Sequence, residues 1–123
     1  MIHSSLLNQR AAIVRGLHYH RAKHFLLLYT YVPDILERRP QFRGAHLKHG
    51  RESVARGELV LAGALADPVD GAVLFFSAPS KDVVEAFAKS DPYVTGGLVT
   101  EWKVRPWTTV LGDGAANPLP PGL

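Results

Sequence analysis

The sequence predicts an α+β fold with the element order β-α-β-β-α-β, in which two helices cover one face of a four-stranded antiparallel sheet. Two observations predict this order: apolar, aromatic and β-branched runs alternate with segments of helical periodicity, and proline, glycine or aspartate separate them. A third observation is the length of 123 residues, which suits one domain and is short for two.

The first strand is predicted from His24 to Val32, an apolar and aromatic run that stops at Pro33. Asp34 is a residue type that caps helices, and a helical turn is expected from there through Arg38.

A helix is predicted next, over residues 41–56. Pro40 suits its first position, and Gly57 suits its end. At 100° per residue, three apolar side chains share one direction and are expected to face the core: Leu36, Leu47 and Val54. Four further side chains cluster on the flank of this stripe: Phe42, His46, His49 and Ser53.

Two strands, Leu59–Ala66 and Ala72–Ser77, are predicted to pair as a hairpin because the residues between them are turn formers. A second helix over residues 81–90 is expected to be capped by Ser80. This helix ends before Pro92, because the residue that precedes a proline disfavours helical geometry.

The last strand is predicted over residues 98–110, with a possible break at Pro106. The resulting order is the ferredoxin-like arrangement. We therefore expect an N-terminal extension over residues 1–22, one domain over residues 23–112, and a C-terminal tail over residues 113–123.

The first and third strands are apolar at successive positions, Phe25–Leu28 and Val73–Phe76. This pattern is typical of strands that are buried on both faces. Because two helices cover only one face of the sheet, we expect the other face to meet a second copy of the chain in a two-fold homodimer.

Composition excludes several classes of protein and site. Hydrophobic residues make up 46% and charged residues 20% of the chain, as in globular domains. Since the chain has no cysteine, disulfides, thiolate nucleophiles and cysteine-based metal sites are excluded. No apolar run approaches the ~20 residues that span a bilayer, and no glycine-rich phosphate loop occurs. We expect neither a membrane partner nor a cofactor.

The net charge of +3 is concentrated at the N-terminus. Residues 24–123 carry ten basic and eleven acidic side chains, a net charge of −1, so no nucleic-acid partner is predicted. Residues 1–22 contain arginine and serine but no acid, and two interpretations stay open: a poorly ordered extension or a transit-like segment. The first predicts a cytoplasmic protein, and the second a protein of the mitochondrial matrix.

Several short stretches occur together along the chain. They are Tyr31-Val32-Pro33-Asp34, Arg38-Arg39, Arg43-Gly44-Ala45-His46-Leu47, Gly57 to Leu65, Ala86 to Val94, Gly97-Leu98-Val99 and Arg105-Pro106-Trp107. In these stretches the chain resembles the YciI-like (YCII-related) family, from about Lys23 to Gly112. The more specific features are Asp91-Pro92-Tyr93 after a helix and the upstream Gly-x-Leu-x-x-x-Gly strand.

The resemblance implies a dimeric α/β barrel of ferredoxin-like protomers, with a pocket between sheet and helices. It also implies an active-site pair, formed by a histidine of the first helix and the aspartate of Asp-Pro-Tyr, which are His46 and Asp91 here. At least one relative in the family is a dehydrochlorinase of a chlorinated hydroxyquinol, which needs neither a metal nor a nucleotide.

An imidazole held by a carboxylate is a general acid/base pair at neutral pH. The alternative is that His46 is a partly buried helix residue and Asp91 only caps a turn. Tyr93 and Ser53 are candidates for positioning a ligand. Arg38, Arg39 and Arg43 are candidates for binding an anionic group, and Arg43 ranks first because it falls closest to the Leu47 stripe; the alternative is that the three form a solvated face.

Two functions from different classes stay open. The first is a small cofactor-independent enzyme, a lyase, isomerase or dehydrochlorinase, that moves a proton of a small organic substrate with His46 and Asp91. The second is a non-catalytic dimeric domain that binds a small ligand or a protein. His46 and His49 also stand at i and i+3, a spacing that suits a metal with Asp91 as third ligand, but no metal is predicted.

Overall fold

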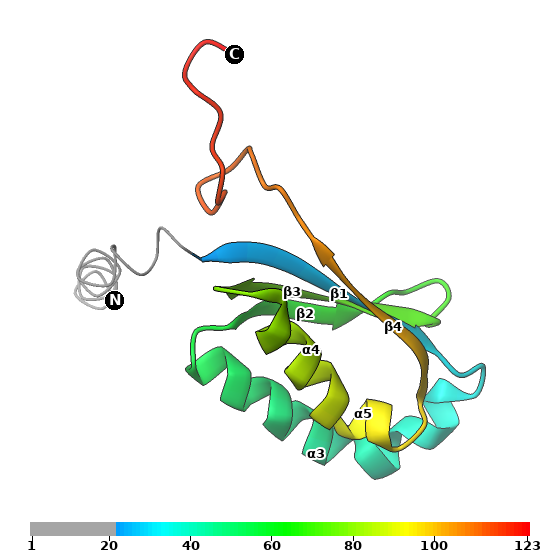
Figure 1. Ribbon diagram of the computed structural model, residues 1–123. Helices are drawn as coiled ribbons and strands as arrows, with labels where there is room; N and C mark the ends of the chain where they lie inside the picture. The colour runs from blue at the N-terminus through cyan, green and yellow to red at the C-terminus, as the bar shows by residue number, and fades with distance from the viewer. Residues whose placement is uncertain (1–21) are drawn as a thin grey trace, which may run out of the picture.

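The computed structural model describes residues 22–123, so the expected extension over residues 1–22 lies almost wholly outside the described residues. In the described part, one four-stranded antiparallel sheet carries three helices on one face (Figure 1). The elements in chain order are β1 (Lys23–Tyr31), α3 (Ile35–Ala55), β2 (Leu59–Ala64), β3 (Gly71–Ala78), α4 (Lys81–Ser90), α5 (Pro92–Thr95) and β4 (Val99–Pro106). The predicted β-α-β-β-α-β order is confirmed.

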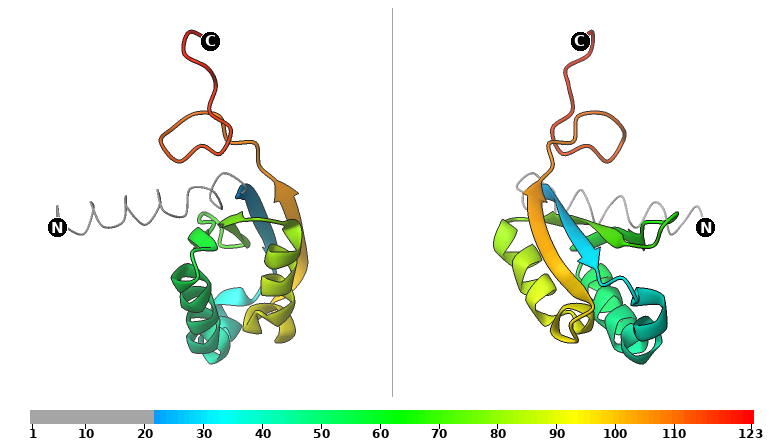
Figure 2. Two further views of the ribbon diagram at one scale, coloured as in Figure 1. Left: turned by 60° about the vertical axis from the view of Figure 1, so that its left-hand side comes forward. Right: turned by 90° about the vertical axis from the view of Figure 1, so that its right-hand side faces the viewer.

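The strand order is β2-β3-β1-β4, and the predicted hairpin of β2 and β3 is confirmed. In the centre of the sheet, Leu27 lies opposite Leu74 on one side and Val104 on the other, and all three are buried beneath the helices. Figure 2 shows α3 and α4 side by side under the sheet. The odd-numbered residues of β1 face these helices, whereas Leu26 and Leu28 face the opposite side.

Helix α3 differs from the prediction because it runs unbroken through Pro40. Proline has no N–H, so the carbonyl of Leu36 loses its usual donor within the helix. Leu36 is exposed, and water can donate to that carbonyl instead. A proline in the second turn therefore costs little stability. One continuous helix forms where the sequence predicted a turn followed by a separate helix.

The predicted buried face of α3 was also wrong. Leu36, Leu47 and Val54 are exposed, whereas the flank that carries His46 turns inward. The reason is that this flank packs against α5 and lines a cavity under the sheet, so polar side chains occupy the inner face. The inward residues are Ile35, Arg39, Phe42, His46, His49 and Ser53.

Helix α4 has its predicted bounds, and Ser80 occupies the N-cap position, although its side chain makes no capping hydrogen bond. The last strand is shorter than predicted and ends at Pro106. Beyond it, Thr109 holds the C-terminal segment to the sheet: its Oγ1 lies 2.7 Å from Nδ1 of His24. None of the helices in residues 22–123 is long and apolar enough to span a membrane.

The short helix α5 was not predicted. It follows α4 directly, and its C-cap residue Gly96 lies against Phe42 of α3. A Cβ at position 96 would stand 2.6 Å from the Phe42 ring, so only glycine permits this close approach. This contact sets how closely α3 and α5 approach each other. His46 lies on α3, and Asp91 is the N-cap residue of α5.

Candidate active site

His46 and Asp91, 45 residues apart in sequence, are joined by a short hydrogen bond. Nδ1 of His46, on α3, lies 2.8 Å from Oδ1 of Asp91, at the junction of α4 and α5. The Asp91 side chain is fully buried, whereas 18% of the His46 side chain is exposed. The carboxylate therefore lies behind the imidazole, and the imidazole reaches the solvent-accessible side.

The backbone of α5 explains why Asp91 is held so firmly. Asp91 is the N-cap of α5, Pro92 takes the first helical position, and the N–H of Tyr93 donates to Oδ1 at 2.9 Å. The hydroxyl of Tyr29, on β1, donates to Oδ2 at 2.7 Å. Asp91 is thus a capping residue and a partner of His46 at once, so the two interpretations of the sequence both apply to its geometry.

This arrangement of donors assigns the tautomer of His46. Oδ1 of Asp91 receives a backbone N–H and Oδ2 receives a hydroxyl, which suits an ionised carboxylate that only accepts. Nδ1 of His46 must then carry the hydrogen and donate it to Oδ1. Nε2 is left with a free lone pair, the atom that a general base uses.

Two tyrosines support this pair. The ring of Tyr93 stacks on the imidazole of His46, with 3.7 Å between ring centroids and 5° between planes. Burial raises the pKa of Tyr29 well above its ordinary value, and the charge of Asp91 and the hydrogen bond to it raise it further. Tyr29 therefore remains a protonated donor to Asp91 across the physiological pH range.

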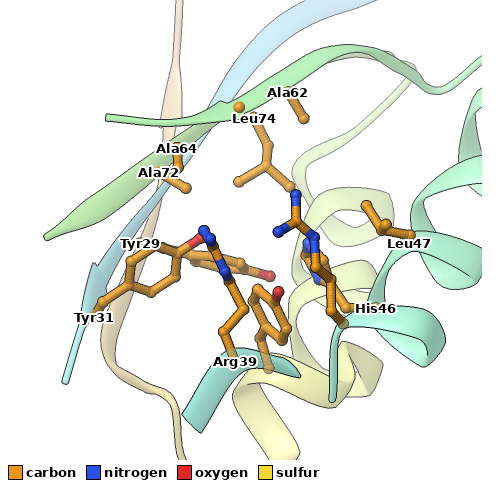
Figure 3. A pocket seen from close by; sticks show the side chains of 12 residues that line it. Tyr29, Tyr31, Arg39, His46, Leu47, Ala62, Ala64, Ala72 and Leu74 are labelled. Carbon is orange, nitrogen blue, oxygen red and sulfur yellow. The ribbon is translucent and has the colours of Figure 1, made fainter. Parts of the chain in front are cut away.

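His46 opens into a cavity of about 230 Å³ between the sheet and α3. Figure 3 shows the wall that β2 and β3 contribute, which consists of small side chains and one leucine. The helix side of the cavity is polar and carries charged groups. The side chains that line the cavity are Arg39, Arg43, His46 and Leu47 from α3, Tyr29 and Tyr31 from β1, Ala62 and Ala64 from β2, Ala72 and Leu74 from β3, and Tyr93 from α5.

The other predicted site residues lie in different places. Arg43 and Tyr93 line the cavity with His46. Ser53 does not line it: its side chain is fully buried and its Oγ has no hydrogen-bond partner among the described residues, so we assign it no ligand contact. His49 turns to α4, where its Nε2 lies 3.0 Å from the carbonyl of Phe87. Residues 22–123 contain no cluster of three histidine or acidic side chains with metal-binding geometry.

Sequence reasoning named Arg39 beside Arg43 but ranked Arg43 first, and it did not name the strand residues of the cavity, Tyr29 and Tyr31 among them. A signal for Arg39 was present, because it precedes Arg43 and His46 at the i, i+4 and i+7 spacing of one helix face. Tyr29 and Tyr31 alternate with Leu27 along β1, so they share the face that the helices cover. Polar hydroxyls on a buried strand face indicate a lined cavity rather than a solid core.

Two solved structures are similar to this chain, and the first of them shares its fold. One is 5-chloro-2-hydroxyhydroquinone dehydrochlorinase from Burkholderia phenoliruptrix in complex with 2,5-dihydroxybenzoquinone, with a TM-score of 0.61 and 24% identity. That match covers 70% of this chain and 94% of the dehydrochlorinase chain. The other is described as an antibiotic biosynthesis monooxygenase from Nitrosomonas europaea, with a TM-score of 0.48, 14% identity and coverage of 68% and 94%.

The comparison with curated proteins returned no match. A family model, in contrast, matches residues 24–108, which include β1 except Lys23, all three described helices and the whole of β4. The match spans more than two thirds of the chain and contains both members of the His46–Asp91 pair. This chain therefore belongs to the YCII-related domain family.

Proposed function

We propose that the protein is a cofactor-independent enzyme that transfers a proton of a small organic substrate, with His46 as the general base and Asp91 as its partner. One observation carries this proposal: the 2.8 Å hydrogen bond between His46 Nδ1 and a fully buried carboxylate, beside a cavity that the same imidazole lines. A general base needs this combination of a fixed tautomer and a free nitrogen within reach of a ligand.

The proton takes a simple route in this proposal. Nε2 of His46 takes a proton from an acidic C–H or O–H group of the substrate, and the bonding electron pair stays on the substrate as an enolate or phenolate. The imidazolium then faces the negative charge of Asp91, which stabilises it. Return of the proton to another carbon makes an isomerase, whereas loss of a leaving group such as chloride from the neighbouring carbon makes a lyase.

The cavity limits the size of the substrate. An apolar cavity of about 150 Å³ accommodates benzene, so roughly 230 Å³ has room for a single ring with a few substituents. The dehydrochlorinase of the same fold binds 2,5-dihydroxybenzoquinone, a ring of this size. This likeness supports a hydroxylated ring or a compact keto acid as the substrate class.

The experiment that tests the proposal is turnover of such compounds by the parent and by Asp91→Asn. Asparagine retains an oxygen for the N–H groups of His46 and Tyr93 but removes the charge that stabilises the imidazolium. We expect turnover to fall by roughly a hundredfold or more. His46→Ala is expected to abolish it. Full turnover by His46→Ala would reject His46 as the base, whereas no turnover of any of these compounds by the parent would leave the alternative of a ligand-binding domain.

We also propose that the active form is a homodimer. The sheet face opposite the helices presents Leu26, Leu28, Val73 and Phe75, all only half-buried in one copy of residues 22–123. Two such faces, related by a two-fold axis, would cover each other. Light scattering of dilute protein is expected to give twice the mass of 13.5 kDa, and a stable monomer would contradict the dimer.

A further inference from the structure

Two guanidinium groups of α3 line the cavity together with the imidazole of His46; Arg39 is half-buried and Arg43 is exposed. Arg39, Arg43 and His46 stand one helical turn apart in succession, and all three line the cavity. In Figure 3 the side chain of Arg39 extends from α3 toward Tyr29 and Tyr31 of β1. The two arginines and the imidazole therefore face one common space.

Neither guanidinium has a carboxylate within salt-bridge distance in residues 22–123. The neighbouring Arg38 pairs with Asp34 at 3.8 Å, and Arg56 pairs with Glu58 at 3.0 Å, so other arginines nearby do have acidic partners. Two like charges at i and i+4 repel each other and destabilise a helix. Two guanidinium groups without acidic partners that line one cavity suit an anionic ligand, because the ligand would neutralise both charges.

The tyrosines show that this positive charge acts inside the cavity. Burial raises the pKa of Tyr31 to about 12, and the charges of Arg39 and Arg43 oppose the rise. The same two arginines oppose the upward shift in the pKa of Tyr93. Both charges thus reach the ring that stacks on His46 as well as the opposite wall on β1.

We infer that Arg39 and Arg43 form an anion receptor, and that the ligand is a single-ring or similarly compact molecule with a delocalised, two-oxygen anionic group. A carboxylate and the ionised enol of a hydroxyquinone share this chemistry. This inference rests on the proposed function for its consequence: the receptor holds the anionic group of the substrate, so that a neighbouring C–H or O–H group lies near Nε2 of His46. When the base takes the proton, the same charges stabilise the new oxyanion.

The test is calorimetric binding of three ring compounds to the full chain. The probes are 2,5-dihydroxybenzoate, 2,5-dihydroxybenzoquinone at neutral pH, and uncharged hydroquinone. We expect the anions to bind more tightly than hydroquinone, with an affinity that falls as salt is added. Tighter binding of the benzoate points to a carboxylate substrate, and tighter binding of the quinone points to an enol; both support the receptor. Equal binding of charged and neutral rings, or no binding of either anion, would overturn it.

Substitutions locate the receptor. Arg39→Gln and Arg43→Gln are each expected to weaken binding of the anions about tenfold or more, and to leave binding of hydroquinone unchanged. Arg38→Gln is the matched control: it removes the same charge from the same helix, but Arg38 pairs with Asp34 outside the cavity. An equal loss of affinity in all three variants would show a general charge effect and reject the receptor.

Asp91→Asn separates this inference from the proposed function. Asp91 lies behind His46 and does not line the cavity, so the variant is expected to bind the anions as tightly as the parent. If anions bind through the arginines but Asp91→Asn turns over normally, the proton-transfer function fails and the receptor stands. If Asp91→Asn loses turnover while both arginine variants bind normally, the receptor fails and the function stands.

Discussion

Tyr93 constrains His46 through its ring and through its backbone at once. The ring stacks on the imidazole at 3.7 Å, and the N–H donates to the same Asp91 oxygen that receives the imidazole Nδ1. The stack sets the plane of the imidazole, and the shared oxygen sets its rotation within that plane. His46 is therefore held in one orientation without a direct hydrogen bond to Tyr93.

This relationship predicts the tautomer of His46 in solution. We expect the neutral imidazole to carry its hydrogen on Nδ1, with Nε2 unprotonated, because Oδ1 of Asp91 only accepts. Long-range proton–nitrogen NMR spectra distinguish the two ring nitrogens. The spectrum of His46→Gln identifies the signals by their loss. A hydrogen on Nε2 instead would contradict the proposed base.

Tyr29→Phe is expected to destabilise the protein by about 1–3 kcal/mol, because it leaves the buried Oδ2 of Asp91 without its hydroxyl donor. The free energy of unfolding in urea measures the loss. Tyr31→Phe is the control: Tyr31 lies two residues along the same strand, and its hydroxyl forms no hydrogen bond within residues 22–123. Equal losses in both variants would show that the Asp91 contact contributes nothing specific.

Stability is expected to decrease at alkaline pH, with Tyr29 as one cause. The folded-state pKa of Tyr29 lies above its ordinary value of 10.0, and that of Tyr31 is raised to about 12, both mainly by burial. A raised pKa in the folded state means that the stabilisation is complete below pH 10 and is lost as pH rises beyond it. Unfolding measured between about pH 9 and about pH 11 is expected to show a shallower decline in Tyr29→Phe than in the parent. Identical slopes would exclude this contribution.

Gly96→Ala is expected to destabilise the protein by about 1–3 kcal/mol and to lower turnover, because the new methyl group meets the Phe42 ring and separates α5 from α3. Gly44→Ala is the matched control. Gly44 is an exposed helical residue with open space around a new Cβ, and alanine there is expected to stabilise by about 0.5–1 kcal/mol. Thermal unfolding and turnover of both variants test this prediction. Unchanged stability and turnover of Gly96→Ala would show that α5 and the Phe42 ring can shift to make room for the methyl group.

The strands and their pairing could be predicted from the sequence, because apolar runs and turn residues are local signals. Local signals did not predict the orientation of the long helix α3. Its apolar residues Leu47 and Val54 predict a buried stripe, yet the structure turns that stripe outward. Periodicity shows that a helix has an apolar side, whereas the side that meets the domain depends on packing against distant elements, here α5, β2 and α4.

The site was predictable to a similar extent. His46 and Asp91 were named from a family resemblance, since a separation of 45 residues carries no information about contact. The role of Tyr29 had no local signal, because its hydrogen bond to Asp91 joins β1 to a junction 62 residues away. Ser53 shares the inner face of α3 with His46 but lies two helical turns further along, where the interior is packed and the cavity has ended.

The small side chains that line the sheet side of the cavity have a consequence for substrate choice. Ala62, Ala64 and Ala72 limit the space above the imidazole by single methyl groups, whereas the base and its partner come from the helices. In the proposed enzyme, side chains of the sheet thus limit the size of the ligand, whereas side chains of the helix layer carry out the acid–base step. We expect an alanine-to-valine change on β2 or β3 to narrow the range of rings that the proposed enzyme accepts and to leave its acid–base chemistry intact.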